Sequence, residues 1–266
     1  MTALLEVRDI VKHYDGIAAV SGATLDVEKG SITGLIGPNG AGKTTLFNIV
    51  SGFQRPEQGL VSFGGARIDH QSADRVARAG LVRTFQETKA LTKMTVLDNM
   101  MLAAPHPGER LTSLVLRPRR VRQREREVEA KAREMLGVVQ LEDHADQYAG
   151  TLSGGQRKLL EFGRALMVEP QMVLLDEPMA GVNPTLGLEL LDLVRKLRDS
   201  RGTTFLLIEH NLEVVMGVCE LIHVMNEGAV IASGPPAAVR SNPQVIDAYL
   251  GTRGASAAPI SGEAAP

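Results

Sequence analysis

The sequence has a single cysteine, no long apolar run and little net charge. Because Cys219 has no second cysteine to pair with, an intramolecular disulfide framework and a cysteine-based zinc site are excluded, and a reducing compartment is expected. No stretch approaches the roughly 18 consecutive apolar residues of a membrane-spanning helix. The first residues also lack the basic start and unbroken apolar core of an export signal. The chain is therefore expected to reach a membrane only through partners.

The charge balance argues against bulk nucleic-acid binding. The 29 basic and 31 acidic residues leave a formal net charge of -2, whereas nucleic-acid binders carry a basic surface. Hydrophobic residues make up 44% and charged residues 23% of the 266 residues, which is typical of an ordinary globular protein. This length suits one sizeable core, or a main domain with a smaller one added.

Short apolar runs typical of β-strands recur along the chain, and several are followed by helical patterns. This alternation predicts an α/β fold. The clearest helix begins at Asn183 and Pro184 and ends at Gly202, with leucines and a valine spaced three and four residues apart. The strand-like runs are 4–11, 23–30, 31–37, 60–65, 172–177, 203–210, 221–228 and 229–234.

The middle of the chain changes character. Residues 91–150 contain mostly helical patterns, which predicts a helical subdomain inserted into the α/β core. From Arg117 to Arg133 there are eight basic and three acidic residues, a balance that is compatible with a membrane-binding or nucleic-acid-binding surface. The mixed charges from Glu125 to Met135 favour a solvated helix instead. The small polar residues of 251–266 predict a disordered tail.

A glycine-rich loop, "GPNGAGKTT", follows the apolar run 31–36. The pattern of a strand, such a loop and then a helix is typical of a phosphate-binding loop, because backbone N–H groups and the positive end of the helix face the anion. Lys43 is expected to reach the β- and γ-phosphates, and the Thr44 hydroxyl to ligate Mg²⁺. The expected nucleotide contacts are Pro38, Asn39, Gly40, Ala41, Gly42, Lys43, Thr44 and Thr45.

Two acidic residues end a second apolar strand, 172–175. A carboxylate at this position lies beside the phosphate loop in such sheets, so Asp176 is the expected Mg²⁺ partner, acting through a metal-bound water or from outside the directly ligating groups. Glu177 is the expected general base that polarises the attacking water. Taken alone, the pair could equally serve solubility at a strand end or cap a helix.

The pentapeptide "LSGGQ", from Leu152 to Gln156, resembles the signature of the ATP-binding-cassette family. In that family two ATPase subunits form a head-to-tail dimer, and each signature caps the ATP on the other subunit's phosphate loop. The resemblance implies γ-phosphate contacts across the interface from Ser153, Gly154 and Gly155, at a helix expected to begin near Gln156. A helix start favours an anion on physical grounds as well.

Three further positions fit the same family. By resemblance, Gln86 lies near Mg²⁺ and the attacking water and leads into the segment that touches a transmembrane partner, with 88–94 as candidates for that surface. His210 matches the switch histidine that contacts the γ-phosphate, and Tyr14 the aromatic on which adenine stacks. One position departs from the pattern: Asn183 stands where many members have Asp, which removes a charge from the loop that joins the two sites.

The resemblance covers about residues 5–251 and implies a phosphate-loop NTPase core with an antiparallel β subdomain and an inserted α-helical subdomain. The expected division is 1–90 for the first part of the ATP-binding core with the β subdomain and 91–165 for the helical signature subdomain. Residues 166–250 would complete the core, before the tail of 251–266.

Within the family, "LDEPMAGVNP" and the C-terminal region resemble the bacterial ATPases that energise uptake of branched-chain amino acids. The implied partners are a second, non-identical or identical ATPase, two transmembrane permeases and, indirectly, a periplasmic binding protein; no nucleic acid is implied. The implied location is the cytoplasmic face of the inner membrane, and the cofactors are ATP and Mg²⁺. The chain length is more similar to the larger of the two importer ATPases.

Other interpretations stay open at this stage. Close relatives serve urea or short-chain amides, and lipid or lipopolysaccharide exporters share every catalytic residue. A cassette ATPase of translation or DNA repair usually has two cassettes or a long coiled coil, and this chain has one cassette and no sustained heptads. A phosphate-loop kinase would leave "LSGGQ" and His210 unexplained.

Overall fold

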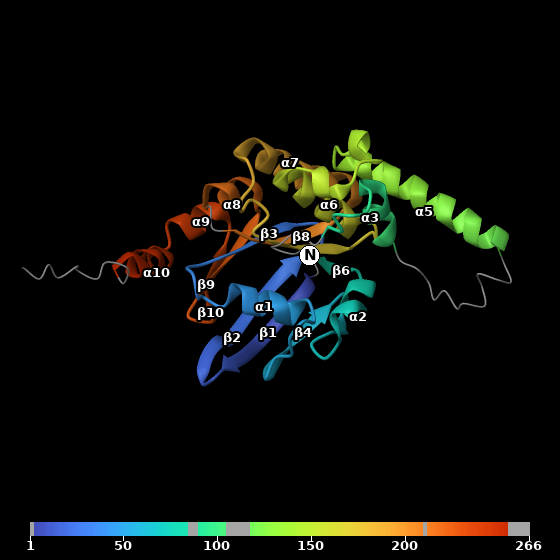
Figure 1. Ribbon diagram of the computed structural model, residues 1–266. Coiled ribbons are helices and arrows are strands. Elements are labelled where there is room, and N and C mark those ends of the chain that lie inside the picture. The colour runs from blue at the N-terminus through green and yellow to red at the C-terminus, as the bar shows by residue number, and fades with distance from the viewer. Residues whose placement is uncertain (1–2, 85–89, 105–117, 210–211, 255–266) are drawn as a thin grey trace, which may run out of the picture.

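The chain forms two β-sheets with helices packed around them (Figure 1). The computed structural model describes residues 3–84, 90–104, 118–209 and 212–254, without the side chains of 118–121 and 250–254. One sheet has six strands and the other four. This arrangement confirms the predicted α/β fold with an antiparallel β portion and a helical insert.

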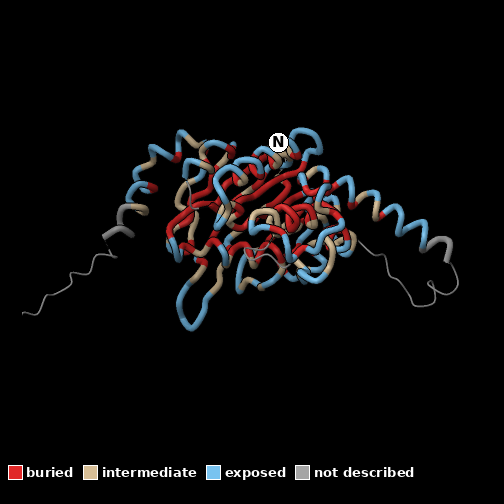
Figure 2. Tube along the Cα trace, turned by 45° about the horizontal axis from the view of Figure 1, so that its top comes forward, coloured by how far each residue is buried: buried red, intermediate tan, exposed pale blue. Residues whose placement is uncertain are grey.

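The six-stranded sheet carries the order β10-β9-β3-β8-β7-β6. Its pairs β9–β3, β3–β8, β8–β7 and β7–β6 are parallel, and only β10 runs antiparallel to its neighbour β9. The central strands β3, β7 and β8 are buried throughout, as expected for parallel strands covered on both faces (Figure 2). Its strands are β3 (Ile32–Ile36), β6 (Leu81–Arg83), β7 (Met172–Asp176), β8 (Thr204–Ile208), β9 (Leu221–Asn226) and β10 (Ala229–Gly234).

The second sheet is antiparallel, in the order β2-β1-β4-β5. Alternate residues of its long strands are buried, and they share a core cluster with helix α1 and one face of the larger sheet. This packing places the sheet against the start of α1, next to the glycine-rich loop. Its elements are β1 (Ala3–Tyr14), β2 (Ile17–Glu28), β4 (Gln58–Phe63) and β5 (Ala66–Arg67), with α1 (Lys43–Val50) and α2 (Ala73–Arg78) nearby.

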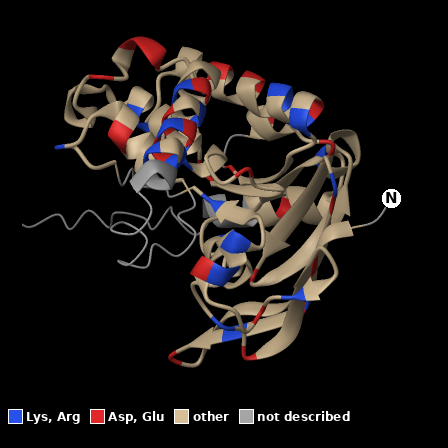
Figure 3. Cartoon of the chain, turned by 90° about the vertical axis from the view of Figure 1, so that its right-hand side faces the viewer, with Lys and Arg blue, Asp and Glu red and all other residues tan. Residues whose placement is uncertain are grey.

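The helical insert packs on the opposite side of the larger sheet (Figure 1). The predicted solvated helix lies within the 21-residue α5 (Pro118–Val138), which carries closely spaced positive and negative side chains (Figure 3). Its second half is not fully solvated, because Val128, Ala132, Met135 and Leu136 are buried against the core. The other elements of the insert are α3 (Val96–Leu102), two short 3₁₀ turns, Glu142–His144 and Ala149–Thr151, and α6 (Gly154–Leu166).

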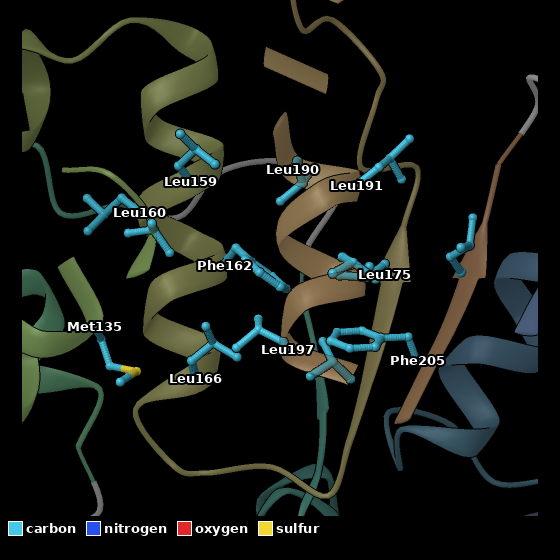
Figure 4. Packing of buried hydrophobic residues seen from close by; sticks show 14 of the residues in the cluster. Met135, Leu159, Leu160, Phe162, Leu166, Leu175, Leu190, Leu191, Leu197 and Phe205 are labelled. Atoms are coloured by element: carbon cyan, nitrogen blue, oxygen red, sulfur yellow. The ribbon is translucent and has the colours of Figure 1, made fainter. Parts of the chain in front are cut away.

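Helix α7 (Pro184–Arg201) follows its sequence signals closely. The Asn183 side chain caps its start by accepting a hydrogen bond from the Thr185 amide, 2.9 Å long, and Gly202 ends it in the left-handed conformation. Its buried residues pack against α6 and strands β7 and β8, so that Phe162 and Phe205 lie in one cluster with Leu197 (Figure 4). The helix therefore joins the insert to the sheet.

Phe162→Ala is expected to destabilise the protein by about 3–5 kcal/mol, because the ring is removed from a close-packed site. Phe162 is only 2% exposed and its ring lies 6.4 Å from that of Phe205. Urea unfolding followed by circular dichroism measures the change. The matched control is Leu188→Ala on α7, a residue 59% exposed, which should cost less than about 1 kcal/mol. Equal losses in both variants would contradict the packing described here.

The C-terminal region contains three helices, α8 (Leu212–Val218), α9 (Pro236–Arg240) and α10 (Pro243–Gly254). Helix α10 extends past residue 251, where the sequence predicts the start of a disordered tail.

The strands β5 and β6 were not predicted from the sequence. β5 has two residues and β6 has three, which is too few for a periodic pattern to be visible. Among the described residues, none of the helices combines the length and the apolar character needed to cross a bilayer.

Candidate functional site

The glycine-rich loop connects buried β3 to α1, as its sequence pattern predicts. Gly42 precedes the helix in a left-handed conformation with φ of +95°, and no side chain caps the helix start. The first amides of α1 are therefore available to an anionic ligand. Thr44 and the loop tip, Asn39 and Gly40, are exposed, which leaves the tip open for a ligand to approach.

Lys43 holds the loop together. Its Nζ donates hydrogen bonds to the carbonyl oxygens of Gly37, 2.8 Å away, and Pro38, 2.9 Å away. The side chain is buried, and this burial lowers the pKa of Lys43, while the nearby Glu177 and Asp176 carboxylates raise it. The lysine charge thus lies between the loop carbonyls and the two predicted acidic residues.

Gly42→Ala is expected to weaken nucleotide binding by more than tenfold, because a Cβ there would lie 2.2 Å from the backbone oxygen of Ala19. The matched control is Gly65→Ala, in the turn between β4 and β5. Gly65 also has a positive φ, +79°, but a Cβ at that position would meet nothing within 4 Å. The control therefore carries the conformational strain of about 1 kcal/mol without the clash. Titration with a fluorescent ATP analogue compares the two, and equal affinities would contradict the close approach of β2.

Asp176 and Glu177 lie where β7 ends, one strand removed from β3 across β8. Asp176 is buried, whereas Glu177 is partly exposed. Glu177 adopts a left-handed backbone conformation, φ +49°, and its amide donates to the carbonyl of Ile208, 3.0 Å away. A residue other than glycine in this region is strained, and such strain is common at functional sites.

Two charged residues that the sequence did not single out support the loop after Glu177. The Glu209 carboxylate is buried and accepts a hydrogen bond of 2.8 Å from the Met179 amide. Lys158 of α6 points into the same loop and donates to the carbonyl of Ala180. The two residues connect this loop to β8 and α6.

A small pocket lies beside the end of β7. It is lined by Thr84, Lys158, Phe162, Leu175, Asp176, Glu177, Pro178 and Leu190.

The signature segment forms the start of α6, which begins at Gly154, two residues before Gln156, near which the helix was expected to begin. Ser153 and Gln156 form a reciprocal capping box: the Ser153 hydroxyl accepts from the Gln156 amide at 3.2 Å, and the Gln156 side chain accepts from the Ser153 amide at 2.9 Å. Gly155 packs so closely on α7 that a Cβ would lie 2.0 Å from Leu186 Cδ2. The exposed Ser153 and Gly154 therefore sit on a firmly held helix start.

Of the remaining predicted site residues, the structure describes Tyr14 and Asn183. Tyr14 ends β1 with 41% of its surface exposed, and its hydroxyl donates to Gln54 Oε1 at 2.5 Å. Lys12 Nζ lies 5.7 Å from the centroid of the ring, which is otherwise partly exposed. Asn183 serves as the helix cap of α7. Gln86 and His210 lie outside the described residues.

Thr44 and Asp176 supply the kind of ligands that Mg²⁺ prefers. Both offer oxygen atoms, the Thr44 hydroxyl at the first turn of α1 and the Asp176 carboxylate at the end of β7. The phosphate loop beside them would hold a ligand whose phosphate oxygens complete such a coordination shell. The residues present thus fit Mg²⁺.

This combination of a phosphate loop, an acidic strand end and a capped signature helix defines an ATPase cassette. A family model described as ABC transporter matches residues 20–180, and one described as branched-chain amino acid ATP-binding cassette transporter matches residues 229–255. The chain belongs to the ATP-binding subunits of the ABC transporter family, and is an ATP-binding ATPase.

Among proteins of this family, the chain is similar to ones named for branched-chain amino acid transport. It is 42% identical to a probable branched-chain amino acid transport ATP-binding protein, LivG, of Archaeoglobus fulgidus, over 94% of this chain and 96% of that protein. It is 40% identical to BraF of Pseudomonas aeruginosa, a high-affinity branched-chain amino acid transport ATP-binding protein, over 93% of this chain and 98% of that protein. The crystal structure of MJ1267, an ATP-binding cassette in its ADP conformation, superposes with a TM-score of 0.82 at 37% identity, covering 94% of this chain and 100% of that one.

Proposed function

We propose that this chain is the larger ATP-hydrolysing subunit of an importer for branched-chain amino acids. The observation that carries the proposal is the C-terminal match, residues 229–255, to the branched-chain amino acid group of cassettes. Its relatives LivG and BraF are named for the same transport over nearly their whole lengths. The catalytic core is shared by all cassettes, so it carries less information about the substrate.

In the proposed reaction, ATP lies with its phosphates in the loop from Gly37 to Thr45. Lys43 offsets charge on the β- and γ-phosphates, and the amides at the start of α1 donate to phosphate oxygens. Thr44 and Asp176 would hold Mg²⁺, which neutralises charge on the phosphates. Tyr14 would stack on adenine, using its exposed ring.

Glu177 would accept hydrogen bonds from the attacking water and orient it toward the γ-phosphate. Burial lowers the pKa of Lys43, and the negative charge of Glu177 opposes that shift. Gln86 and His210, which follow β6 and β8 in the sequence, would complete the site. These two roles rest on the family resemblance.

A second ATPase subunit would complete each site through Ser153, Gly154, Gly155 and Gln156. The exposed start of α6 supports this, because amides and a hydroxyl at a helix start attract a phosphate. Two subunits would close when the γ-phosphate bridges them and open after hydrolysis. Two permeases would take up this motion at the cytoplasmic face of the membrane, with a periplasmic binding protein delivering the substrate.

The proposal is tested by purifying tagged Glu177→Gln from its native membranes in mild detergent with Mg²⁺ and ATP. Mass spectrometry should identify a second, smaller ATPase and two permeases. Reconstituted with these partners, the wild-type chain should drive uptake of leucine, isoleucine or valine. Recovery of ribosomes or of a lipid-export permease would overturn the proposed transport function, and uptake of urea or amides would overturn the substrate.

A further inference from the structure

A buried ion pair joins the predicted Mg²⁺ partner to a strand that the sequence did not predict. Arg83, the last residue of β6, donates from Nη2 to Asp176 Oδ2 across 2.6 Å. The two side chains are only 10% and 2% exposed. The partners are 93 residues apart in the sequence and meet because β6 pairs with β7.

The other end of the guanidinium is fixed to the helix that follows the phosphate loop. Nη1 donates to Asn48 Oδ1 at 2.6 Å and lies 3.5 Å from Ser51 Oγ. The rings of Phe47 and Phe53 lie 5.8 and 5.9 Å from the guanidinium carbon. A planar group that is hydrogen-bonded through both terminal nitrogens and lies beside two aromatic rings is restricted in orientation, which a lysine ammonium does not reproduce.

We propose that Arg83 is a positioning residue that sets the metal affinity of the site by holding Asp176. The hydrogen bond occupies Oδ2, which restrains the carboxylate and leaves Oδ1 for the metal or a metal-bound water. Partners of this kind commonly change metal affinity by about 10- to 100-fold when removed. The proposal rests on the metal role of Asp176 under the proposed function.

The same contact also links α1 to β7, because Asn48 lies on the helix that carries Lys43 and Thr44. Arg83 therefore holds the two halves of the metal site, the Thr44 side and the Asp176 side, at a fixed separation. A variant that keeps the positive charge but lacks the planar, two-ended guanidinium is expected not to hold the two halves of the metal site at this separation. This expectation distinguishes geometry from charge.

The test measures Mn²⁺ binding by electron paramagnetic resonance on the purified full chain with a non-hydrolysable ATP analogue. The variants are Arg83→Met and Arg83→Lys. The control is Arg67→Met, because Arg67 pairs with another buried carboxylate, Asp69, at 2.7 Å in the antiparallel sheet away from the phosphate loop. Analogue binding in EDTA and thermal unfolding are measured for each variant, so that a folded site is established before the metal is added.

Both Arg83 variants should bind Mn²⁺ about tenfold or more weakly, with analogue affinity in EDTA within about twofold and the control unchanged. Wild-type affinity in Arg83→Lys would show that charge alone matters and would overturn the proposal. Tighter Mn²⁺ binding in Arg83→Met would also overturn it, because the arginine would then compete with the metal. If Arg83→Met does not fold, the Arg83→Lys result decides.

Asp176→Asn separates this proposal from the proposed function. Weaker Mn²⁺ binding in Asp176→Asn, together with unchanged binding in both Arg83 variants, would overturn the role of Arg83 and leave the metal role of Asp176 standing. Unchanged Mn²⁺ binding in Asp176→Asn would overturn the metal role itself, and with it the reason for positioning the carboxylate.

Discussion

Glu177→Gln is expected to lower the ATPase rate by about 10²- to 10⁴-fold while nucleotide affinity stays within about threefold. The glutamine side chain has nearly the same shape as that of glutamate. The strained backbone at φ +49° and the hydrogen bond from the backbone N–H of residue 177 to the Ile208 carbonyl are therefore retained. What is lost is the negative charge that would polarise water. Phosphate release at saturating ATP and binding of a fluorescent ATP analogue measure the two quantities separately.

The matched control for this experiment is Glu189→Gln on the exposed side of α7. It removes the same charge from the chain at a surface position and should retain the full rate. If Glu177→Gln also retains the rate, another residue is the base. If both variants lose activity, the loss reflects net charge and not the position at the end of β7.

Lys43→Ala is expected to weaken nucleotide binding by roughly 10- to 100-fold, because a hydrogen bond to a charged group contributes about 1.5–3 kcal/mol. The substitution removes the ammonium, whose Nζ donates hydrogen bonds of 2.8 and 2.9 Å to the carbonyls of Gly37 and Pro38. The loop should therefore lose both its positive charge for the phosphates and the hydrogen bonds that hold its own backbone. Calorimetric titration with ATP measures the affinity.

Lys196→Ala, on the exposed face of α7, is the control for Lys43→Ala. It should bind ATP as the wild-type chain does. Thermal unfolding distinguishes local loosening of the loop from global loss of structure. An unchanged ATP affinity in Lys43→Ala would mean that the nucleotide binds elsewhere.

Local sequence signals predicted those parts of the structure that local chemistry determines. The caps of α7 at Asn183 and Gly202 set both of its ends, and the glycine-rich loop appeared between a buried strand and a helix. The helix α6 was expected to begin near Gln156, and it begins two residues earlier, at Gly154. The serine and glutamine three residues apart are in fact a capping box, which the sequence already contained.

Arg83, Lys158 and Glu209 could not be predicted because their partners are distant in the sequence. Arg83 meets Asp176 only after β6 has paired with β7, and Lys158 reaches Ala180 only through the packing of α6. A lone arginine at the end of a three-residue strand has no periodic pattern around it. Such contacts depend on tertiary packing, which single-sequence patterns do not contain.

The strand order has a consequence for how the protein is made. The partners of β3 in its sheet are β8 and β9, so the strand that leads into the phosphate loop is synthesised long before either neighbour. At ribosomal rates of about 5–20 residues per second, the delay between β3 and β9 is roughly 10–40 s. Until β8 and β9 are synthesised, the nascent chain carries this strand, which is apolar except for Thr33, without its neighbours in the sheet. The strand that leads into the phosphate loop therefore cannot have both of its sheet neighbours until β9 has been synthesised.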